Sequence, residues 1–548
     1  MAREDSQATW LAVIVVTFAA GLRFYGLDWG LPDSSHLYSY HPDEFLIIGA
    51  VGNIIQSSLP GFYNYPSLYI YLSALAIIVG CSALGSGAMG FELYLYARVV
   101  TVILGVAAVG MAYWAGRVFY GATVGLIAAF VLCVAPLHVQ HSHFATVDVP
   151  STVFVAAALG YAALILSRGS RRDYILGGIM VGLAAGTKYN AGLVFLSLIA
   201  AHFLREHTTW RSIRSRVLWA SLGCALLAFV ASTPGALLQR GPFSRAILYE
   251  VRHAAAGHDL VFAGTGNGFI YTFTSSLWYG LGPGLTILFA AAVVYAVWKR
   301  DRAALVILAF VIPYYALISL SQVRFARYAL PLFPAVTILC GWMVREVWAK
   351  ASAGPRPWLK WAWVGVCALV GLSTLVYTLA LDGLFACPDP RDRAAYWVSS
   401  NIAKGSAIAV MEVPWFYSPP FSTSVGSGTL PHRQEEARRT PYELIVLTGR
   451  KTPGSWTQGR SAPRWVILSD YETSDALRLR HNRSISEQDR ARVDHILADL
   501  NAVRKRYMQV SEFSSPLRIW GLPIGTTESL PHDMRYQSPT IRIYKLRQ

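Results

Sequence analysis

The sequence predicts an all-α polytopic membrane protein that carries a smaller α/β domain at its C-terminal end. Of its 548 residues, 54% are hydrophobic and only 14% are charged, and the mean hydropathy is +0.40, well above what a soluble domain needs to fill its core. Apolar runs of about 16 to 22 residues, each near the helix length that crosses about 30 Å of hydrocarbon, recur from Thr9 to Leu381 and then stop. We therefore expect a transmembrane domain at 1–381 and an extracytoplasmic α/β domain at 382–548.

The orientation follows from the loops rich in lysine and arginine, which lie around 168–172, 205–216, 299–302 and 345–360. The positive-inside rule places these loops in the cytoplasm, so the alternate loops lie outside. About eleven crossings result, near 9–25, 93–115, 121–137, 150–167, 174–189, 190–204, 217–234, 276–298, 303–320, 329–347 and 361–381. An apolar segment at 67–84 would break this parity, and we interpret it as juxtamembrane or re-entrant. The segments predicted outside are 26–92, 138–149, 235–275, 321–328 and 382–548, which suits a multi-pass protein of a bacterial inner membrane.

The tail alternates strand and helix patterns. Strands are expected at 407–413, 443–448, 465–469 and 541–545, and helices at 392–402 and 486–505. Such a domain could cover a pocket on the outer face or simply add stability. The formal net charge of +16 lies partly in the topogenic loops, so nucleic acid is not an expected partner. Basic surface beside a membrane is expected to meet anionic lipid headgroups or phosphate-bearing carriers, or only solvent.

The first polar break in the apolar pattern, at 40–45, contains His41, Asp43 and Glu44, and an apolar run at 46–55 follows it. At the start of a helix, both carboxylates can point toward one site while they favour the helix dipole. The alternative is a capping pair, because acids are preferred at helix N-termini for structural reasons alone.

The second polar break, at 138–150, contains three histidines and Asp148, which comes just before the next helix and so reaches the same outer face as Asp43. The spacing of His138, His141 and His143 is not a recognised zinc pattern. We expect these histidines to make hydrogen bonds, and we predict no metal site.

Cations follow on the same predicted face. Lys188 stands alone between two apolar helices, and Arg324, Arg327 and Tyr328 stand at the entrance to a late helix. A lysine there is costly unless it pairs, binds an anion or extends to the membrane interface. The pattern predicts an outer-face pocket in which a carboxylate can act as a base and cations can hold a phosphate. The cytoplasmic segments contain no phosphate-binding glycine loop, which argues against a nucleotide-driven pump.

At these residues the sequence resembles the GT-C glycosyltransferases, in particular the protein O-mannosyltransferase and aminoarabinose transferase-like enzymes (family 39/83 type). The resemblance covers 9–381 and rests on the Asp43-Glu44 pair in a long first outer loop, on Asp148 before a membrane helix, and on an Arg-Tyr-x-x-Pro entrance at 327–331. The stretch 64–69 is similar to the family's Pro-Pro-Leu element, with Tyr65 in place of the first proline.

The resemblance implies an enzyme that moves one hexose or pentose from a polyprenyl-phosphate carrier to an acceptor hydroxyl on a protein, lipid or polysaccharide, with inversion. It implies Asp43 as general base and Glu44 and Asp148 as groups that orient the acceptor or the sugar. The donor phosphate would be bound by Lys188, Arg324 and Arg327. The remaining pocket residues would be His41, Tyr65, His143, Tyr189 and Tyr328. This scheme requires no cofactor and leaves a divalent cation open.

Two other classes of protein fit part of the pattern. A secondary transporter has many helices and buried charge, but it is expected to show repeated halves and charge at mid-membrane. A non-catalytic subunit of a cell-envelope polysaccharide assembly system would not need Asp43.

Overall fold

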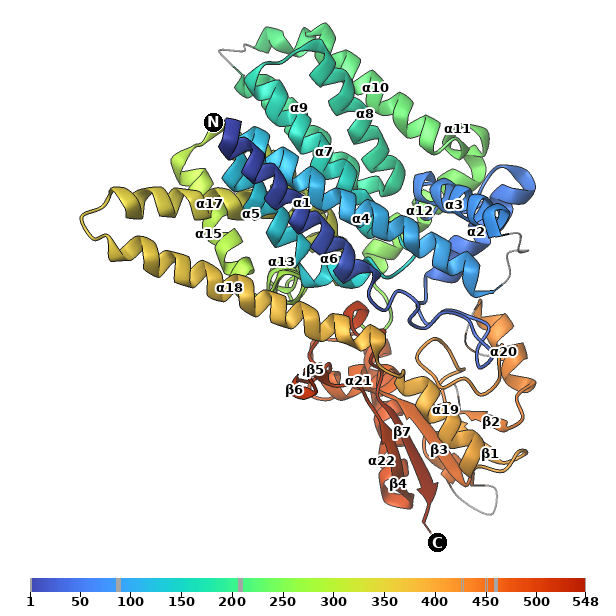
Figure 1. The fold of residues 1–548 in the computed structure, drawn as a ribbon. Coiled ribbons are helices and arrows are strands. Elements are labelled where there is room, and N and C mark those ends of the chain that lie inside the picture. Colours follow the sequence, from blue (N-terminus) through green and yellow to red (C-terminus); the bar gives the residue numbers. More distant parts are fainter. Residues whose placement is uncertain are drawn as a thin grey trace.

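A helical part and an α/β part follow one another along the chain of this computed structural model, which describes residues 2–84, 90–205, 210–424, 426, 428–448, 450, 452–457 and 462–547 (Figure 1). The α-helices of the first part are α1 (Ala2–Phe24), α2 (Glu44–Ser57), α3 (Leu68–Leu84), α4 (Phe91–Tyr120), α5 (Ala122–Cys133), α6 (Pro136–His141), α7 (Asp148–Ser167), α8 (Arg171–Thr187), α9 (Phe195–Leu204), α10 (Arg216–Ser232), α11 (Gly235–Leu238), α12 (Arg240–Ala256), α13 (Gly268–Tyr271), α14 (Trp278–Leu281), α15 (Pro283–Lys299), α16 (Arg302–Leu320), α17 (Phe333–Ala353) and α18 (Trp358–Asp382).

Six helices in the described part of the chain are long and apolar enough to cross a membrane. They are α1, α4, α7, α16, α17 and α18, and each coincides with one of the predicted crossings. The other predicted crossings correspond to shorter helices, so the count of eleven crossings stays a prediction. The segment at 67–84 is a 17-residue helix, α3, that packs against α2 and α4.

Two predicted crossings are not continuous helices. The segment 121–137 ends as helix at Cys133 and restarts at Pro136, and the segment 276–298 is interrupted at Gly282, whose φ is 88°. In both places a proline follows the break. Proline disfavours helical backbone in the residue before it and lacks an N–H, so it starts a new helix at its first position. The prediction of unbroken helices was therefore wrong here.

The helix pair α8 and α10 packs closely because α8 presents glycine to its partner. A Cβ atom at Gly178 would lie 2.1 Å from the carbonyl oxygen of Ser221, and one at Gly182 would lie 2.3 Å from that of Ala225. Small residues let helices in a membrane approach one another in this way. This contact fixes α8, whose C-terminal end carries Lys188.

Within its described residues, the α/β part contains four α-helices and two sheets. The helices are α19 (Pro390–Asn401), α20 (Leu430–Arg438), α21 (Asp470–Leu479) and α22 (Glu487–Arg506). The strands are β1 (Ala407–Val410), β2 (Glu443–Val446), β3 (Trp465–Ser469), β4 (Tyr507–Phe513), β5 (Leu517–Ile519), β6 (Leu522–Gly525) and β7 (Ile541–Leu546). The main sheet has the order β2-β1-β3-β7-β4, in which β2, β1 and β3 are parallel and β7 is antiparallel to both neighbours.

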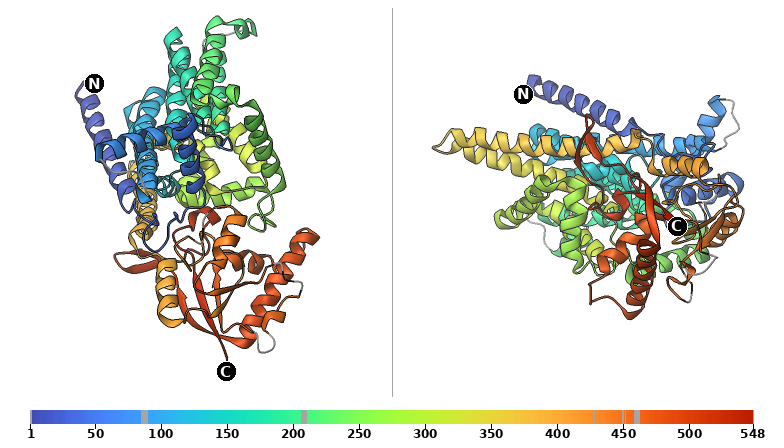
Figure 2. Two further views of the ribbon diagram at one scale, coloured as in Figure 1. Left: turned by 90° about the vertical axis from the view of Figure 1, so that its right-hand side faces the viewer. Right: turned by 90° about the horizontal axis from the view of Figure 1, so that it is seen from below.

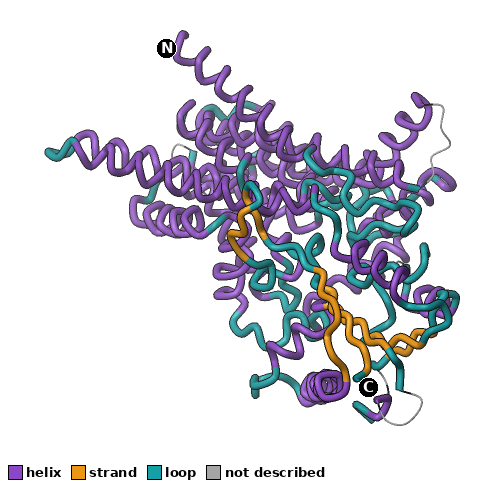
Figure 3. The backbone as a smooth tube through the Cα atoms, turned by 60° about the horizontal axis from the view of Figure 1, so that its bottom comes forward, coloured by secondary structure: helices purple, strands orange, loops and turns teal. Residues whose placement is uncertain are grey.

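Helices cover both faces of this sheet, and the residues of β3 alternate between them. Trp465 and Ile467 belong to the core with α19, whereas Val466 and Leu468 belong to the core with α21 and α22. This is the period of two expected for a strand buried on both faces. Figure 3 shows the strands of the sheet lying side by side beneath the helical part. The predicted strands and helices of the tail are present, and β4, β5 and β6 were not predicted.

The two parts are joined where α18 ends (Figure 2). The short sheet β5-β6 lies against the end of α18, and Leu517, Leu530 and Met534 belong to the core of the helical part. The short helix η7 (His532–Met534) also contacts η4 (Ala326–Leu332), the 3₁₀ helix that precedes α17. The last residues of the tail thereby reach the ends of the membrane helices.

Candidate active site

A cavity of about 950 Å³ lies at this junction, and we call it the junction cavity. Its wall is made by the stretches 42–46, 61–65, 242–261, 325–328, 412–417, 471–476, 492–496 and 532–536. Every one of them comes from a segment that the sequence analysis placed outside the membrane. The predicted outer segments therefore meet at one end of the molecule.

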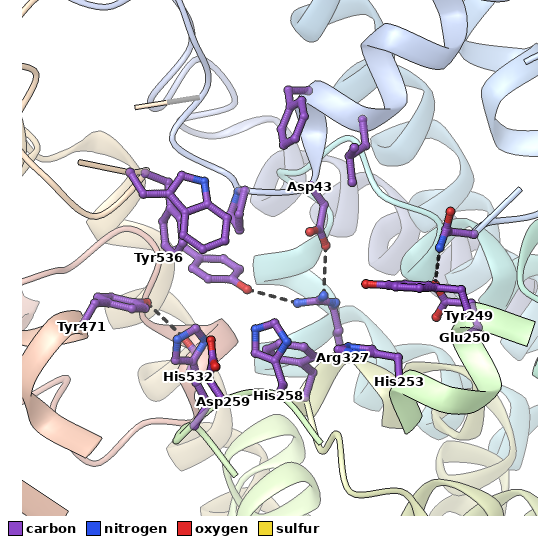
Figure 4. A pocket seen from close by; sticks show the side chains of 18 of the residues that line it. Asp43, Tyr249, Glu250, His253, His258, Asp259, Arg327, Tyr471, His532 and Tyr536 are labelled. Atoms are coloured by element: carbon purple, nitrogen blue, oxygen red, sulfur yellow. Dashed lines mark hydrogen bonds and ion pairs between the residues drawn. The ribbon is translucent and has the colours of Figure 1, made fainter. Parts of the chain in front are cut away.

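Arg327 is the central cation of this site, and its side chain is 6% exposed. Its Nη2 donates to Asp43 Oδ2 at 2.9 Å, and its Nη1 donates to the hydroxyl of Tyr536 at 3.1 Å (Figure 4). Two further carboxylates lie close to the guanidinium: Asp148 at 3.8 Å and Asp533 at 4.0 Å. A buried arginine is stable in such a place because several acceptors satisfy its planar donors.

The backbone around Arg327 explains why its side chain is held so firmly. The N–H groups of Ala326 and Arg327 begin η4 and donate to the carboxylate of Asp533 at 3.0 and 2.9 Å. The free N–H groups at the start of a helix favour a carboxylate at this position. Asp533 was not predicted as a site residue, and a single acid in an irregular stretch of the tail provides no sequence signal.

Asp43 faces the junction cavity. Its carboxylate accepts from Arg327 and from the hydroxyl of Tyr65 at 3.4 Å, and its side chain is 19% exposed. Asp43 is the N-cap residue of α2, but its side chain makes no capping hydrogen bond. The capping interpretation therefore has no support in its contacts, and the carboxylate is available to the cavity.

Glu44 turns the other way, into the protein. It is fully buried, pairs with Arg98 through two bonds of 2.8 Å, and accepts from the backbone N–H of Ala145 at 2.6 Å. It is not among the residues that line the junction cavity. This position gives no support to the predicted role in orienting substrate. Glu44 instead connects the start of α2 to α4 and to the loop that precedes α7.

Asp148 and Lys188 form a buried ion pair directly behind Arg327. The Nζ of Lys188 also lies 5.0 Å from the ring centre of Tyr328. Neither Lys188 nor Asp148 lines the junction cavity, although both adjoin the Arg327 side chain that does. Lys188 is thus paired, as a lysine among apolar helices must be.

Arg324 is held away from the cavity by neutral acceptors. Its guanidinium donates to the hydroxyl of Thr265 and to the carbonyl oxygen of Gly266, both at 2.8 Å, and to the carbonyl oxygen of Ser321 at 3.1 Å. It does not line the cavity. These contacts fix the loop that precedes α13, so the expectation that Arg324 binds the donor phosphate gains no support.

The predicted pocket residues separate into two groups. Tyr65 and Tyr328 line the junction cavity. His41 lies beneath it, with its ring against Phe144, and burial keeps the pKa of its imidazole well below the ordinary value. Tyr189 lies one layer out and donates to the carbonyl oxygen of Tyr63 at 2.9 Å.

His143 lies elsewhere, stacked on Phe385 with ring centres 4.0 Å apart, and its two nitrogens contact the carbonyl oxygens of Val139 and Tyr25. His138 likewise contacts Arg23 at 2.9 Å and Thr152 at 3.1 Å. The predicted hydrogen bonds are therefore present for His138 and His143, whereas neither ring nitrogen of the buried His141 has a hydrogen-bond partner in the described part of the chain. Within the described ranges, no group of three or more histidine, cysteine, aspartate or glutamate side chains could hold a metal. The requirement for a metal or cofactor stays open.

Several cavity residues were missed by the sequence analysis. From α12 come the neighbours Tyr249 and Glu250 and, one helical turn further on, His253, and from the loop after α12 comes His258 (Figure 4). Glu250 accepts from Asn64 at 2.7 Å, and burial raises the pKa of its carboxyl. Burial lowers the pKa of His258. The spacing along α12 is a signal that a search for amphipathic helices in the outer loops would have found.

The α/β part contributes the opposite wall, which is aromatic and acidic. The rings of Tyr417 and Tyr471 stack with centres 5.9 Å apart, and Tyr417 donates to Glu412 at 3.1 Å. His532 lies against Tyr471, which donates to its carbonyl oxygen at 3.0 Å (Figure 4). Aromatic faces beside carboxylates can bind polar molecules that also carry C–H surface.

The arrangement of the whole chain is similar to known structures. ArnT from Cupriavidus metallidurans bound to undecaprenyl phosphate has a TM-score of 0.52 at 15% identity, with 97% of each chain covered. The same protein in its apo state gives 0.52 at 17% identity, with 87% of this chain and 96% of that one covered. The archaeal oligosaccharyltransferase AglB from Archaeoglobus fulgidus, in complex with an inhibitory peptide and a dolichol-phosphate, gives 0.50 at 13% identity, with 98% and 77% covered.

This chain has the GT-C fold. Residues 88–234 also match the family model of the dolichyl-phosphate-mannose-protein mannosyltransferases, which agrees with the resemblance found in the sequence. No sequence among curated proteins matches the chain. With its long apolar helices, the GT-C fold makes this a multi-pass integral membrane protein. The junction cavity of this GT-C fold combines carboxylates with a buried arginine.

Proposed function

We propose that the protein is a membrane glycosyltransferase that moves a single sugar from a polyprenyl-phosphate carrier to an acceptor hydroxyl on the outer face of the membrane. One observation carries the proposal: Asp43 and Arg327, a base and a cation, are paired at 2.9 Å on the wall of the junction cavity. The ligands of the similar solved structures, undecaprenyl phosphate and dolichol-phosphate, add support for the donor class.

In the proposed reaction Asp43 accepts the proton of the acceptor hydroxyl. The acceptor oxygen forms a bond to the anomeric carbon, and the bond from that carbon to the phosphate oxygen breaks. Both electrons of this bond leave with the polyprenyl phosphate, and attack from the face opposite the phosphate inverts the anomeric carbon. A carboxylate within reach of the cavity is suited to this task, because general-base catalysis requires a hydrogen bond to the proton that is removed.

Arg327 is the residue best placed to stabilise the departing phosphate, since its guanidinium reaches the cavity and carries donors in a planar array. Lys188 supports it from behind through Asp148, which Arg327 also approaches. Arg245, on the cavity face of α12, is a further cation for the donor. This assignment moves the phosphate site toward Arg327 and Arg245 and away from Arg324.

The acceptor is proposed to enter from the α/β side, along the wall that contains Tyr417, Tyr471 and Glu412. The two stacked rings offer apolar surface and the carboxylate accepts hydrogen bonds, so a hydroxyl-bearing acceptor can be oriented toward Asp43. The α/β part would then select the acceptor in addition to stabilising the fold.

The test uses the purified full chain with lipid-linked donors of several sugars, and it measures the release of polyprenyl phosphate. We expect release with at least one donor, and its loss in Asp43→Asn. Movement of a lipid-linked sugar across a vesicle membrane without transfer would instead favour a transporter. Neither activity with any donor would favour a non-catalytic subunit.

A further inference from the structure

A second cavity, of about 780 Å³, lies at the other end of the helical part. Helix α7 connects the two ends: it begins at Asp148, beside Arg327, and its last turn contains Leu166, which lines the second cavity. The wall is built by residues from five separate parts of the chain: 119–120, 166, 204–205, 299–303 and 345–346. We call it the basic cavity.

Five cations and two acids line the basic cavity: Arg205, Lys299, Arg300, Arg302, Arg345, Asp301 and Glu346. Glu346 already binds Lys299 at 2.5 Å and Arg345 at 3.3 Å. Asp301 accepts from the hydroxyl of Tyr120 at 2.7 Å and from the N–H of Ala304 at 2.9 Å, at the start of α16. Both carboxylates are therefore engaged, and the cavity keeps an excess of positive charge.

Arg300 and Arg302 make no ion pair with any described residue, and both stand where folding alone favours another side chain. Arg300 adopts a φ of 53°, in the left-handed region that glycine enters without strain. Arg302 is the first residue of α16, where a positive charge opposes the helix dipole. Neither position is explained by local stability, so a charged ligand offers a reason for both.

The surroundings of the basic cavity point to a lipid as the source of that ligand. Trp298, next to Lys299, is 74% exposed, and Trp358 and Trp361 at the start of α18 are 60% and 65% exposed. Exposed tryptophans at helix ends mark the level of the membrane–water interface. Under the cations lie the rings of Tyr120 and Trp342, stacked with centres 5.6 Å apart. The cavity thus opens where lipid headgroups lie.

We propose that the basic cavity binds the phosphate of an anionic phospholipid headgroup. The loops around the basic cavity follow the positive-inside rule. That rule requires positive charge in each cytoplasmic loop but does not require the charges of different loops to lie close together. Here cations from separate loops converge on one cavity between helices, which is the arrangement that binds phosphate-bearing headgroups. The site lies at the opposite end of α7 from the junction cavity, so it is independent of the proposed sugar transfer.

The test compares binding of cardiolipin and of phosphatidylcholine to the purified full chain in detergent, by native mass spectrometry. The test variant is Arg300→Gly with Arg302→Gln: glycine relieves the strained backbone, so the fold is retained while two cations are removed. The matched control is Arg171→Gln with Arg172→Gln, which removes two exposed cations from the start of α8, outside the cavity.

We expect cardiolipin to bind the native chain more tightly than phosphatidylcholine, and this preference to fall about fivefold for each cavity cation removed. The control variant should keep the native preference for cardiolipin. Equal loss in the test variant and the control would mean that cardiolipin responds to cationic surface in general and not to this cavity, and an unchanged test variant would also overturn the proposal. A third arm adds inorganic phosphate or pyrophosphate: displacement of cardiolipin at similar concentrations would assign the site to a soluble anion instead.

Discussion

The guanidinium of Arg327 and the carboxylate of Asp43 meet at 2.9 Å across 284 positions of the chain. One residue precedes the second helix and the other precedes the last membrane helices, so only the folded bundle brings them together. The same guanidinium holds Tyr536 of the tail at 3.1 Å. A single side chain thus connects the first outer loop, the bundle and the α/β part, and a phosphate that binds Arg327 would affect all three.

The first prediction concerns the shape of this cation. Arg327→Lys keeps the charge, but a single ammonium cannot bind Asp43, Tyr536 and a phosphate in one plane. We expect polyprenyl phosphate release to fall by about 10²–10³-fold, as when one transition-state donor is lost. The control is Arg324→Lys, which loosens a loop and should change turnover much less. Equal effects of the two substitutions would remove the special role of Arg327.

The buried pair of Lys188 and Asp148 allows a double-mutant cycle. Lys188→Met leaves the buried Asp148 carboxylate without its closest cation, with Arg327 at 3.8 Å, and should lower the free energy of unfolding by about 3 kcal/mol. Adding Asp148→Asn removes that unpaired charge, so the double variant should recover part of the loss.

The same cycle separates stability from donor binding at Lys188. If Lys188 assists the departing phosphate, turnover stays low in the double variant even though thermal stability returns. Turnover that recovers together with stability would show that Lys188 acts only as the partner of Asp148. Both quantities are measured on one purified preparation of each variant.

The third prediction concerns topology. Helix α7 begins at Asp148, beside the Arg327 side chain of the junction cavity, and ends at the basic cavity, so the loop after Ser167 and the α/β part should lie on opposite sides of the membrane. A tag after Gln548 should be labelled from outside in intact cells, and a tag within 168–172 should be labelled only after permeabilisation. The reverse result would place the junction cavity in the cytoplasm.

The fourth prediction uses Glu472, whose carboxyl pKa is raised by burial from 4.5 to about 8. Because the folded protein holds this proton more tightly than the unfolded chain, the stabilisation is complete below pH 4.5. It is lost as the pH rises through about 8, and the loss is on the order of a few kcal/mol. Thermal unfolding of the α/β part should therefore occur at lower temperature at pH 9 than at pH 5. Glu472→Gln should flatten this dependence, whereas Glu443→Gln, on an exposed strand residue, should not.

The sequence predicted that the site contains the pair Asp43 and Glu44, but it could not show which of the two carboxylates faces the cavity. The structure explains why. Neighbouring residues at a helix start differ in direction by about 100°, so one carboxylate faces the junction cavity and the other faces Arg98 in the core. Which of the two points outward depends on how α2 packs, and no local pattern encodes that choice.

The helical architecture followed from hydrophobic runs, because a membrane helix must be apolar over nearly its full length. The breaks at Pro136 and Pro283 were also visible in the sequence and could have been predicted from the prolines. The roles of Asp533 and Tyr536 could not have been predicted from the sequence. Both residues lie in an irregular stretch without periodicity, and their importance arises only from contacts with Arg327 that are more than 200 positions away in the chain.

The last prediction tests Asp43 as the base. Asp43→Asn keeps the size of the side chain and an oxygen that can accept from Arg327, so the protein should insert, fold and bind the lipid-linked donor. It cannot take up a proton, and turnover should fall by about 10²–10⁴-fold with donor affinity nearly unchanged. If Asp43 acted only as a helix cap, the two substitutions Asp43→Asn and Asp43→Ala would differ in their effect. Asparagine caps helices about as well as aspartate, so a cap would tolerate Asp43→Asn and lose stability only in Asp43→Ala. Since the Asp43 carboxylate makes no capping bond, we expect both variants to lose turnover, and Asp43→Ala also to unfold at a lower temperature because it removes an acceptor of the buried Arg327. Retained turnover in Asp43→Asn would exclude it as the base and leave the pair with Arg327 as a structural contact.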